Sequence, residues 1–164
     1  MGEAMVSAQG FVNRLKRLGL VCRKVRGREE WVCWDPERCF EVKVFGDVRS
    51  GIVVEIGGEG ELSQARDFWS SATIDDLIKG LERMSGARNV SLRHVYESKL
   101  QLYYPLEDWE KALRFIEALT KLKPDFKITN LYGDVLLRIG NRDVSIRQFL
   151  EELEKAMKES VPVT

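Results

Sequence analysis

The sequence contains few of the side chains that build metal and nucleophilic sites. It has one histidine, His94, and three cysteines without any Cys-x-x-Cys spacing in 164 residues. A structural zinc site takes four Cys or His ligands at close spacing, so we expect no zinc. No Ser, Cys or Thr has a histidine at motif spacing, and a lone strand histidine is more typical of a surface or hydrogen-bonded residue. We therefore expect no bound metal or cofactor.

The cysteines are also too few for a disulfide framework. Cys22 and Cys33 fall in apolar, strand-like segments, where a free cysteine behaves as a small buried hydrophobe, and Cys39 leaves the count odd. Cytosolic thiols stay reduced. The sequence thus predicts free thiols and a cytoplasmic protein.

Long apolar runs and phosphate-binding loops are missing as well. No run approaches the roughly 20 residues that span a bilayer. The opening segment "MGEAMVSAQG" has neither the basic-then-apolar pattern of a secretory signal nor a myristoylation motif. The glycine segments "GDVRSG" and "IGGEGE" are not followed by Lys-Ser/Thr. We expect no membrane association and no nucleotide loop.

Net charge is absent too, but its distribution is uneven. The chain has 26 basic and 26 acidic residues, and its high charged fraction of 32% resembles the composition of thermophile proteins. The segment from Gly10 to Arg28 carries seven basic residues and no acidic one, so the rest of the chain is acidic overall. The seven are Arg14, Lys16, Arg17, Arg23, Lys24, Arg26 and Arg28. This polarity favours an anionic partner.

The hydrophobic periodicity predicts an α+β fold of antiparallel strands packed against amphipathic helices. We expect one domain over residues 1–160, with halves 1–60 and 61–160 as an alternative division. Helical patterns cover residues 4–18, 61–70, 73–86, 105–123 and 145–158. Strand patterns cover 20–26, 30–34, 39–45, 50–58, 89–96 and 99–104, and residues 125–140 form a further hairpin with a turn at Tyr132-Gly133. A helix end followed by a hairpin recurs three times, which is compatible with repeated units.

The stretch "CFEVKVF", residues 39–45, raises the question of catalysis. It contains Glu41 and Lys43 on one face of a strand, with Asp35 upstream in "WDPER". By this motif the segment resembles the PD-(D/E)xK nucleases, in which two carboxylates hold a divalent cation and the lysine stabilises charge at the attacked phosphate. The resemblance covers about the first third of the chain and implies a metal-dependent nuclease using Asp35, Glu41 and Lys43.

The strand register decides whether these three side chains meet. After a turn of two or four residues, Asp35 shares a face with Phe40, Val42 and Val44, and Lys43 lies across from Glu30 as an ordinary ion pair. After a turn of three or five residues, Asp35 joins Glu41 and Lys43, and this register gives the better apolar match. In either case we expect Glu41 and Lys43 to face solvent, and the apolar trio to face a helix-covered core.

The leading hypothesis is a non-enzymatic domain that binds nucleic acid through its basic segment. The expected phosphate contacts are Arg14, Arg17, Arg23, Lys24, Arg26 and Arg28. Trp31 or Trp34 is available for stacking. One alternative is a protein-interaction subunit that pairs with another chain through an apolar strand or the acidic last helix. The metal-dependent nuclease is a second alternative.

Overall fold

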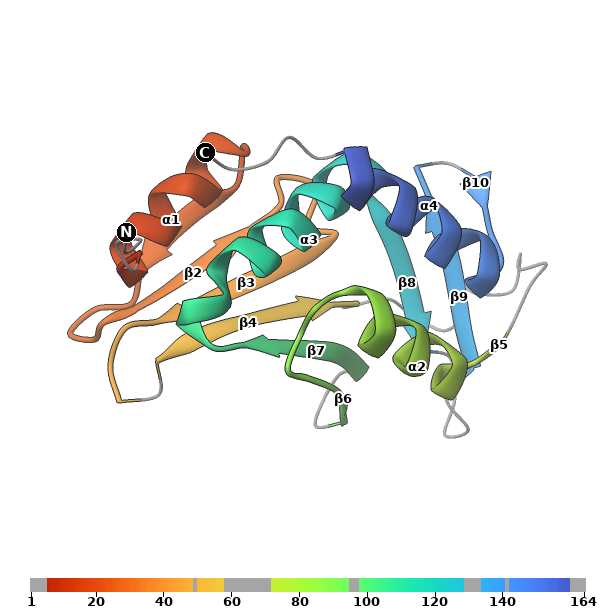
Figure 1. Ribbon diagram of the computed structural model, residues 1–164, viewed down its shortest axis with the longest axis horizontal. Coiled ribbons are helices and arrows are strands. Elements are labelled where there is room, and N and C mark those ends of the chain that lie inside the picture. Colours follow the sequence, from red (N-terminus) through yellow and green to blue (C-terminus); the bar gives the residue numbers. More distant parts are fainter. Residues whose placement is uncertain are drawn as a thin grey trace.

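A computed structural model describes residues 6–48, 50–57, 72–94, 98–128, 134–140 and 142–159 (Figure 1). The helices are α1 (Ala8–Arg17), α2 (Ile74–Met84), α3 (Trp109–Leu122) and α4 (Ile146–Glu159), with a short 3-10 helix η2 (Leu106–Asp108) before α3. The strands are β1 (Val21–Lys24), β2 (Glu30–Trp34), β3 (Phe40–Phe45), β4 (Gly51–Ile56), β5 (Ala72–Thr73), β6 (Asn89–His94), β7 (Ser98–Tyr104), β8 (Pro124–Ile128), β9 (Asp134–Ile139) and β10 (Arg142–Asp143). The fold is α+β, as predicted.

Six strands form one antiparallel sheet in the order β1-β2-β3-β4-β7-β6. The first four strands follow one another as a meander, and the β6–β7 hairpin joins it through β7, which pairs with β4. The predicted meander is confirmed. Strand β1 is the free edge that directly follows α1.

A second, smaller antiparallel sheet is centred on β9. That strand pairs with β8 along one edge and with the two-residue strands β10 and β5 along the other. The predicted hairpin is confirmed in its two strands, whereas β5 and β10 were not expected. The predicted helix over 61–70 and the turn at Tyr132-Gly133 lie outside the described residues.

The helices of the described chain lie on one side of the sheets (Figure 1). In β3 the side chains of Phe40, Val42 and Val44 face this side and are at most 2% exposed, within one core that includes α1 and α3 residues. Glu41 and Lys43 point to the other side and are half-buried. The predicted choice of faces is confirmed. Its physical reason is that burial of each large apolar side chain stabilises the fold by roughly 1.5 to 3 kcal/mol.

Local capping explains several helix ends. Ser7 caps α1 by accepting a hydrogen bond from the Gly10 amide at 3.0 Å. In α4, Ser145 Oγ accepts from the Gln148 amide at 3.1 Å and Gln148 Oε1 accepts from the Ser145 amide at 3.0 Å, so the predicted cap is a reciprocal capping box. Helix α3 ends at Leu122, and its C-cap residue Lys123 adopts a left-handed conformation with φ of 52°.

A helix precedes a pair of antiparallel strands three times: α1 before β1 and β2, α2 before β6 and β7, and α3 before β8 and β9. This is the arrangement that the recurring pattern predicted, and common descent of the three units stays a prediction. Within the described ranges, none of the helices has both the length and the hydrophobicity to cross a membrane.

Candidate functional site

The register between β2 and β3 separates the nuclease-like residues. Cys33 pairs with Val42 and Trp34 with Glu41, and the Asp35 amide donates to the Phe40 carbonyl at 3.2 Å across a four-residue turn. Asp35 therefore lies on the core side of the sheet, opposite to Glu41 and Lys43. The structure does not bring the three side chains together on one face, as the nuclease alternative requires.

The structure adopts the four-residue turn, one of the two alternatives that the sequence left open, but Lys43 lies across from Val32 rather than from Glu30, as was expected for that register. The reason lies in the turn. Asp35 Oδ2 accepts from the Glu37 amide at 3.0 Å and from the Cys39 amide at 3.4 Å, which closes a four-residue turn.

The Asp35 carboxylate also joins this turn to the end of α3. Asp35 is only 1% exposed, and Lys123 Nζ lies 3.3 Å from its Oδ1 and 3.7 Å from Glu37 Oε1. Burial would lower the pKa of Lys123, but the neighbouring Asp35 carboxylate outweighs it and the pKa is raised. A buried carboxylate is thus neutralised by a cation 88 residues away in the chain.

Asp35, Glu37 and Cys39 bring one potential ligand atom each to within 4.8 Å of one another. Two features favour a structural role over metal binding. The Asp35 oxygens already accept two amides and contact the Lys123 ammonium, which stands where a cation would be needed. Burial, together with the Asp35 charge, raises the pKa of Cys39 to about 12, so its thiol stays protonated.

On the opposite face, Lys43 takes part in a different charged cluster. Its Nζ lies 3.1 Å from Oε1 of Glu55, whose side chain is 1% exposed, and Gln101 Nε2 donates to Glu55 Oε2 at 2.7 Å. Burial alone would raise the pKa of Glu55, but the contacts from Gln101 and Lys43 together lower it. Sequence analysis missed Glu55, although it is the single charge in the apolar strand "GIVVEI".

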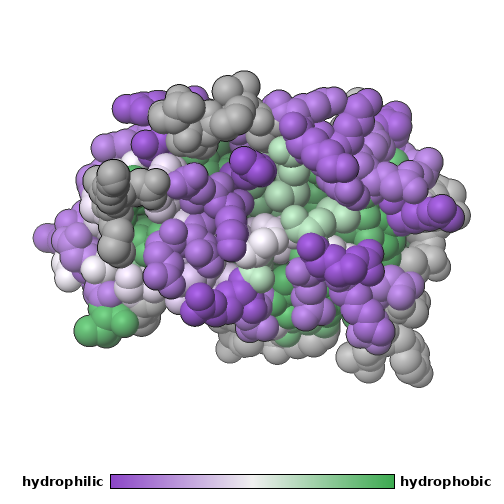
Figure 2. Space-filling model, in the orientation of Figure 1, coloured by the Kyte–Doolittle hydropathy of each residue, from purple (hydrophilic) through white to green (hydrophobic). Residues whose placement is uncertain are grey.

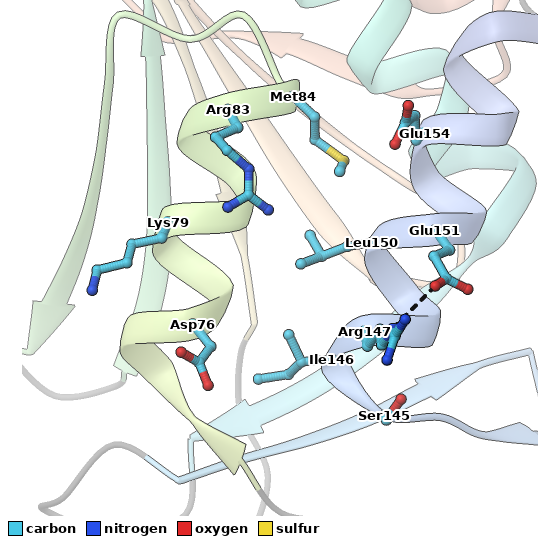
Figure 3. A pocket seen from close by; sticks show the side chains of 10 residues that line it. All are labelled: Asp76, Lys79, Arg83, Met84, Ser145, Ile146, Arg147, Leu150, Glu151 and Glu154. Atoms are coloured by element: carbon cyan, nitrogen blue, oxygen red, sulfur yellow. Dashed lines mark hydrogen bonds and ion pairs between the residues drawn. The ribbon is translucent and has the colours of Figure 1, made fainter.

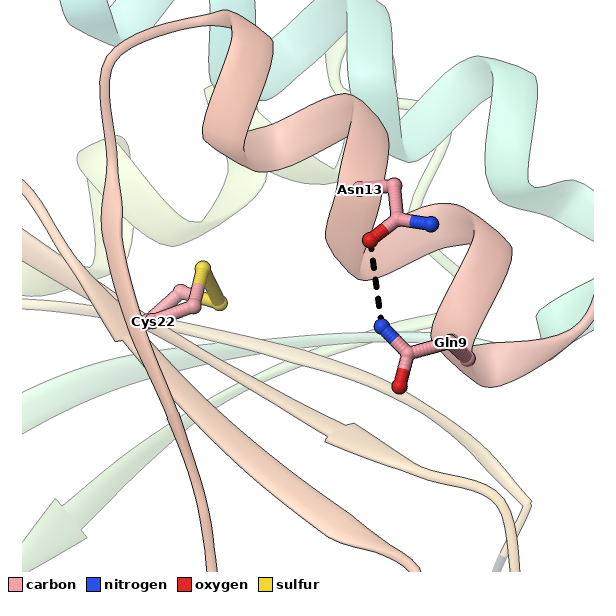
Figure 4. Close-up of a disulfide and its surroundings, with 4 residues drawn as sticks. Gln9, Asn13 and Cys22 are labelled. Atoms are coloured by element: carbon pink, nitrogen blue, oxygen red, sulfur yellow. Dashed lines mark hydrogen bonds between the residues drawn. A yellow bond between two sulfur atoms is a disulfide. The ribbon is translucent and has the colours of Figure 1, made fainter.

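The prediction of free thiols is wrong for two of the three cysteines. Cys22 and Cys33 lie directly opposite each other in the β1–β2 pair and form a disulfide, while Cys39 is free. The antiparallel register brings their Cα atoms to 4.0 Å, a proximity that the sequence alone does not reveal. The bond lies on the α1 side of the sheet, near the hydrogen-bonded pair Gln9 and Asn13 (Figure 4).

The six predicted phosphate contacts divide into two groups. Three of them already have local partners: Lys24 lies 3.1 Å from Glu29, Arg28 lies 4.0 Å from Glu30, and Arg14 stacks 4.6 Å from the centroid of Trp109. The others, together with one further lysine, are exposed and form no ion pair with any described residue. These free cations are Lys16, Arg17, Arg23 and Arg26, and we call them the basic ridge.

The basic ridge follows the free edge of the large sheet. Lys16 and Arg17 belong to the last turn of α1, Arg23 lies in the edge strand β1, and Arg26 lies in the turn that leads to β2. At about 3.3 Å per extended residue, the stretch from the start of β1 to Arg26 covers roughly 17 Å. Arg23 pairs with Val32, which pairs with Lys43, so the basic ridge extends around the edge strand with Arg23 on the face of the sheet opposite to α1.

The aromatic residues near the ridge differ in their accessibility. Trp31 is 5% exposed and lies under Lys24, whose Nζ is 5.5 Å from the ring centroid, so it offers no face for stacking. Trp34 is half-buried on the other side of the sheet, and the Arg38 guanidinium lies 5.6 Å from its ring. His94 ends β6, and its side chain lies outside the described part of the chain.

Comparisons with protein-family models, with curated proteins and with solved structures found no match to this chain. Functional inference therefore rests on the residues themselves. Of the groups described above, the Asp35 turn and the Glu55 cluster have mutually satisfied charges. The basic ridge does not, and unsatisfied exposed charge is the feature that an anionic ligand can use.

Proposed function

We propose that this chain binds nucleic acid through the basic ridge. The observation that carries the proposal is that four exposed cations near one edge of the large sheet, two in α1, one in β1 and one in the following turn, have no ion-pair partner among the described residues. Cations without a protein partner are free to exchange their counterions for phosphates. Lys24 and Arg28 contribute less, because binding phosphate would require them to leave Glu29 and Glu30.

The expected mode of binding is contact with the phosphate backbone. Each phosphate contact contributes about 0.7 to 0.9 to the slope of log affinity against log salt. A complex that uses all four cations should have a slope of roughly 3. Base stacking contributes little, because Trp31 is buried and Trp34 is already covered by Arg38. Binding should therefore depend weakly on base sequence.

The test uses fluorescein-labelled 20-nucleotide DNA and RNA, single- and double-stranded, in anisotropy titrations at about 50 to 200 mM salt. The double variant Arg23→Glu/Arg26→Glu should weaken binding by a similar factor for every sequence and flatten the salt slope by roughly 2. The matched control is Lys121→Glu/Lys155→Glu, which makes the same charge change on exposed positions of α3 and α4.

Two outcomes would contradict the proposal. One is the absence of saturable binding to any of the probes at about 50 mM salt. The other is an equal loss of binding in the ridge variant and in the control, which would trace the attraction to overall charge rather than to this surface. Thermal midpoints of both double variants equal to that of wild type would show that a loss of binding does not come from unfolding.

A further inference from the structure

The edge strand β1 is attached to the rest of the fold by few side-chain contacts. Its four residues pair with β2 alone among the described strands. None of the four side chains is buried, whereas the strands β2 and β3 alternate between buried and half-buried positions. Leu20, just before β1, is 5% exposed and anchors the start of the strand. Hydrophobic burial therefore contributes little to the attachment of β1 beyond its first residue.

The Cys22–Cys33 disulfide is the strongest side-chain restraint on this strand. The other printed contacts of β1 side chains are made by Lys24, which pairs with Glu29 at 3.1 Å and lies 5.5 Å from the Trp31 ring centroid. The side chains of that ion pair are 51% and 59% exposed, and ion pairs this exposed stabilise a fold only slightly. Without the disulfide, β1 would be held mainly by its backbone pairing with β2.

Half of the basic ridge depends on this strand. Arg23 follows Cys22 directly, and Arg26 lies in the turn that joins β1 to β2. Lys16 and Arg17 belong to α1, which packs on the core through its own buried residues. Opening the disulfide should therefore loosen two of the four ridge cations and leave the other two in place.

The disulfide is approachable from solvent at one of its two residues. Cys33 is fully buried, at 0% exposed, whereas Cys22 is half-buried. The α1 side chains drawn near the bond, Gln9 and Asn13, are polar and exposed (Figure 4). In Figure 2 the coloured surface over α1 is mainly hydrophilic. An external thiol would therefore meet the bond at Cys22.

We propose that the Cys22–Cys33 disulfide is a redox switch for nucleic-acid binding by the basic ridge. A thiolate of an external dithiol attacks the Cys22 sulfur, and Cys33 leaves as a thiolate that takes up a proton. The second thiolate of the reductant then attacks its own sulfur in the mixed disulfide, so that Cys22 also leaves and is protonated. The protein gains two electrons and two protons, and the dithiol becomes a cyclic disulfide.

The oxidised protein is the binding form in this proposal, which rests on the proposed function because it concerns the same cations. In anisotropy titrations with the 20-nucleotide probes, the oxidised protein should show a salt slope of roughly 3. The reduced protein should show a slope of roughly 1.5 and an affinity roughly tenfold weaker at about 100 mM salt, because two phosphate contacts are lost.

The experiment poises the protein in mixtures of reduced and oxidised dithiothreitol. Alkylation followed by mass spectrometry reports the fraction of open disulfide, and this fraction should change at the same mixing ratio as the affinity. Cys22→Ser/Cys33→Ser should bind like reduced wild type with or without the reductant. Cys39→Ser is the matched control and should respond to the reductant as wild type does, because Cys39 is outside the disulfide.

Hydrogen exchange at a temperature below the unfolding transition of the reduced protein separates local loosening from unfolding. Reduction should accelerate exchange in Val21–Lys24. Helices α2 and α4 are the internal reference. They enclose a hollow of about 560 Å³ (Figure 3) and lie beyond α3 as seen from α1 (Figure 1). Their exchange should be the same in both redox forms.

Equal affinity and equal salt slope of the two redox forms would overturn the switch while leaving nucleic-acid binding intact, since the disulfide would then serve stability alone. Loss of the redox response in Cys39→Ser would overturn it as well. Accelerated exchange throughout α2 and α4 would trace the weaker binding to general unfolding and have the same consequence. Absence of saturable binding by the oxidised protein would instead contradict the proposed function, and the switch would fall with it.

Discussion

Removing the Cys22–Cys33 disulfide should lower the stability of the protein by a calculable amount. The bond joins strands β1 and β2 with a sequence separation of 11 residues. Loop-closure entropy for a loop of that length corresponds to about 3 kcal/mol at room temperature. For a chain of this size, each kcal/mol shifts the thermal midpoint by about 2 to 4 °C. Reduction should therefore lower the midpoint by about 6 to 12 °C.

The loss should be concentrated at the sheet edge. Among the described strands, β1 pairs only with β2, and it has four residues, so the disulfide replaces contacts that an inner strand would receive from a second neighbour. Amide hydrogen exchange of Val21–Lys24 should accelerate on reduction more than that of β3 or β4. The basic ridge includes Arg23 in this strand, so its geometry depends on the same bond.

The assay compares thermal unfolding of wild type, Cys22→Ser and Cys39→Ser, with and without reductant. Thiol titration of the unreduced, denatured chain should find one free thiol, Cys39, and three after reduction. Cys39→Ser should keep its response to reductant, whereas Cys22→Ser should lose it. A count of three thiols before reduction, or a midpoint unaffected by reductant, would refute the reasoning.

Two further predictions concern titratable groups. Lys43→Met should destabilise the protein by up to about 3 kcal/mol near neutral pH, because it removes the cation that lies 3.1 Å from the buried Glu55 carboxylate and leaves it Gln101 and the charge of Lys99. Because the pKa of Glu55 is lowered in the folded state, its carboxylate stabilises the fold at pH values above the ordinary pKa of 4.5, and this stabilisation is lost as the pH falls through the folded-state pKa. Urea unfolding from pH 7 to pH 3 should therefore show the unfolding free energies of wild type and Lys43→Met converging in acid. A difference between them that stays constant with pH would contradict this prediction. With a pKa of about 12, Cys39 should react with iodoacetamide at pH 8 roughly a thousandfold more slowly than an ordinary exposed cysteine. Mass spectrometry would measure the labelling rate, and rapid labelling of Cys39 in the folded chain would contradict the raised pKa.

The fold was predictable where the controlling interactions are local. The alternation in residues 40–45 predicts which side of β3 is buried, since successive side chains of a strand point to opposite faces. Ser145 and Gln148 predict the start of α4 because their hydrogen bonds span three residues. The burial of this face and the helix start are both confirmed.

The candidate sites were less predictable because they depend on distant partners. The turn after Asp35 is closed with help from Lys123, and Glu55 is held by Gln101, which is 46 residues away. The disulfide needed the exact pairing of β1 with β2, and a one-residue slip would place the cysteines on opposite faces. The apolar pattern of two neighbouring strands contains no information about such contacts with residues elsewhere in the fold.

The distribution of charge reconciles the absence of net charge with the proposed role of the basic ridge. Equal totals of 26 basic and 26 acidic residues leave no long-range field to attract a partner. At physiological salt, exposed charges act over only about 8 Å. The proposed binding at the basic ridge would therefore depend on cations that have no ion-pair partner among the described residues.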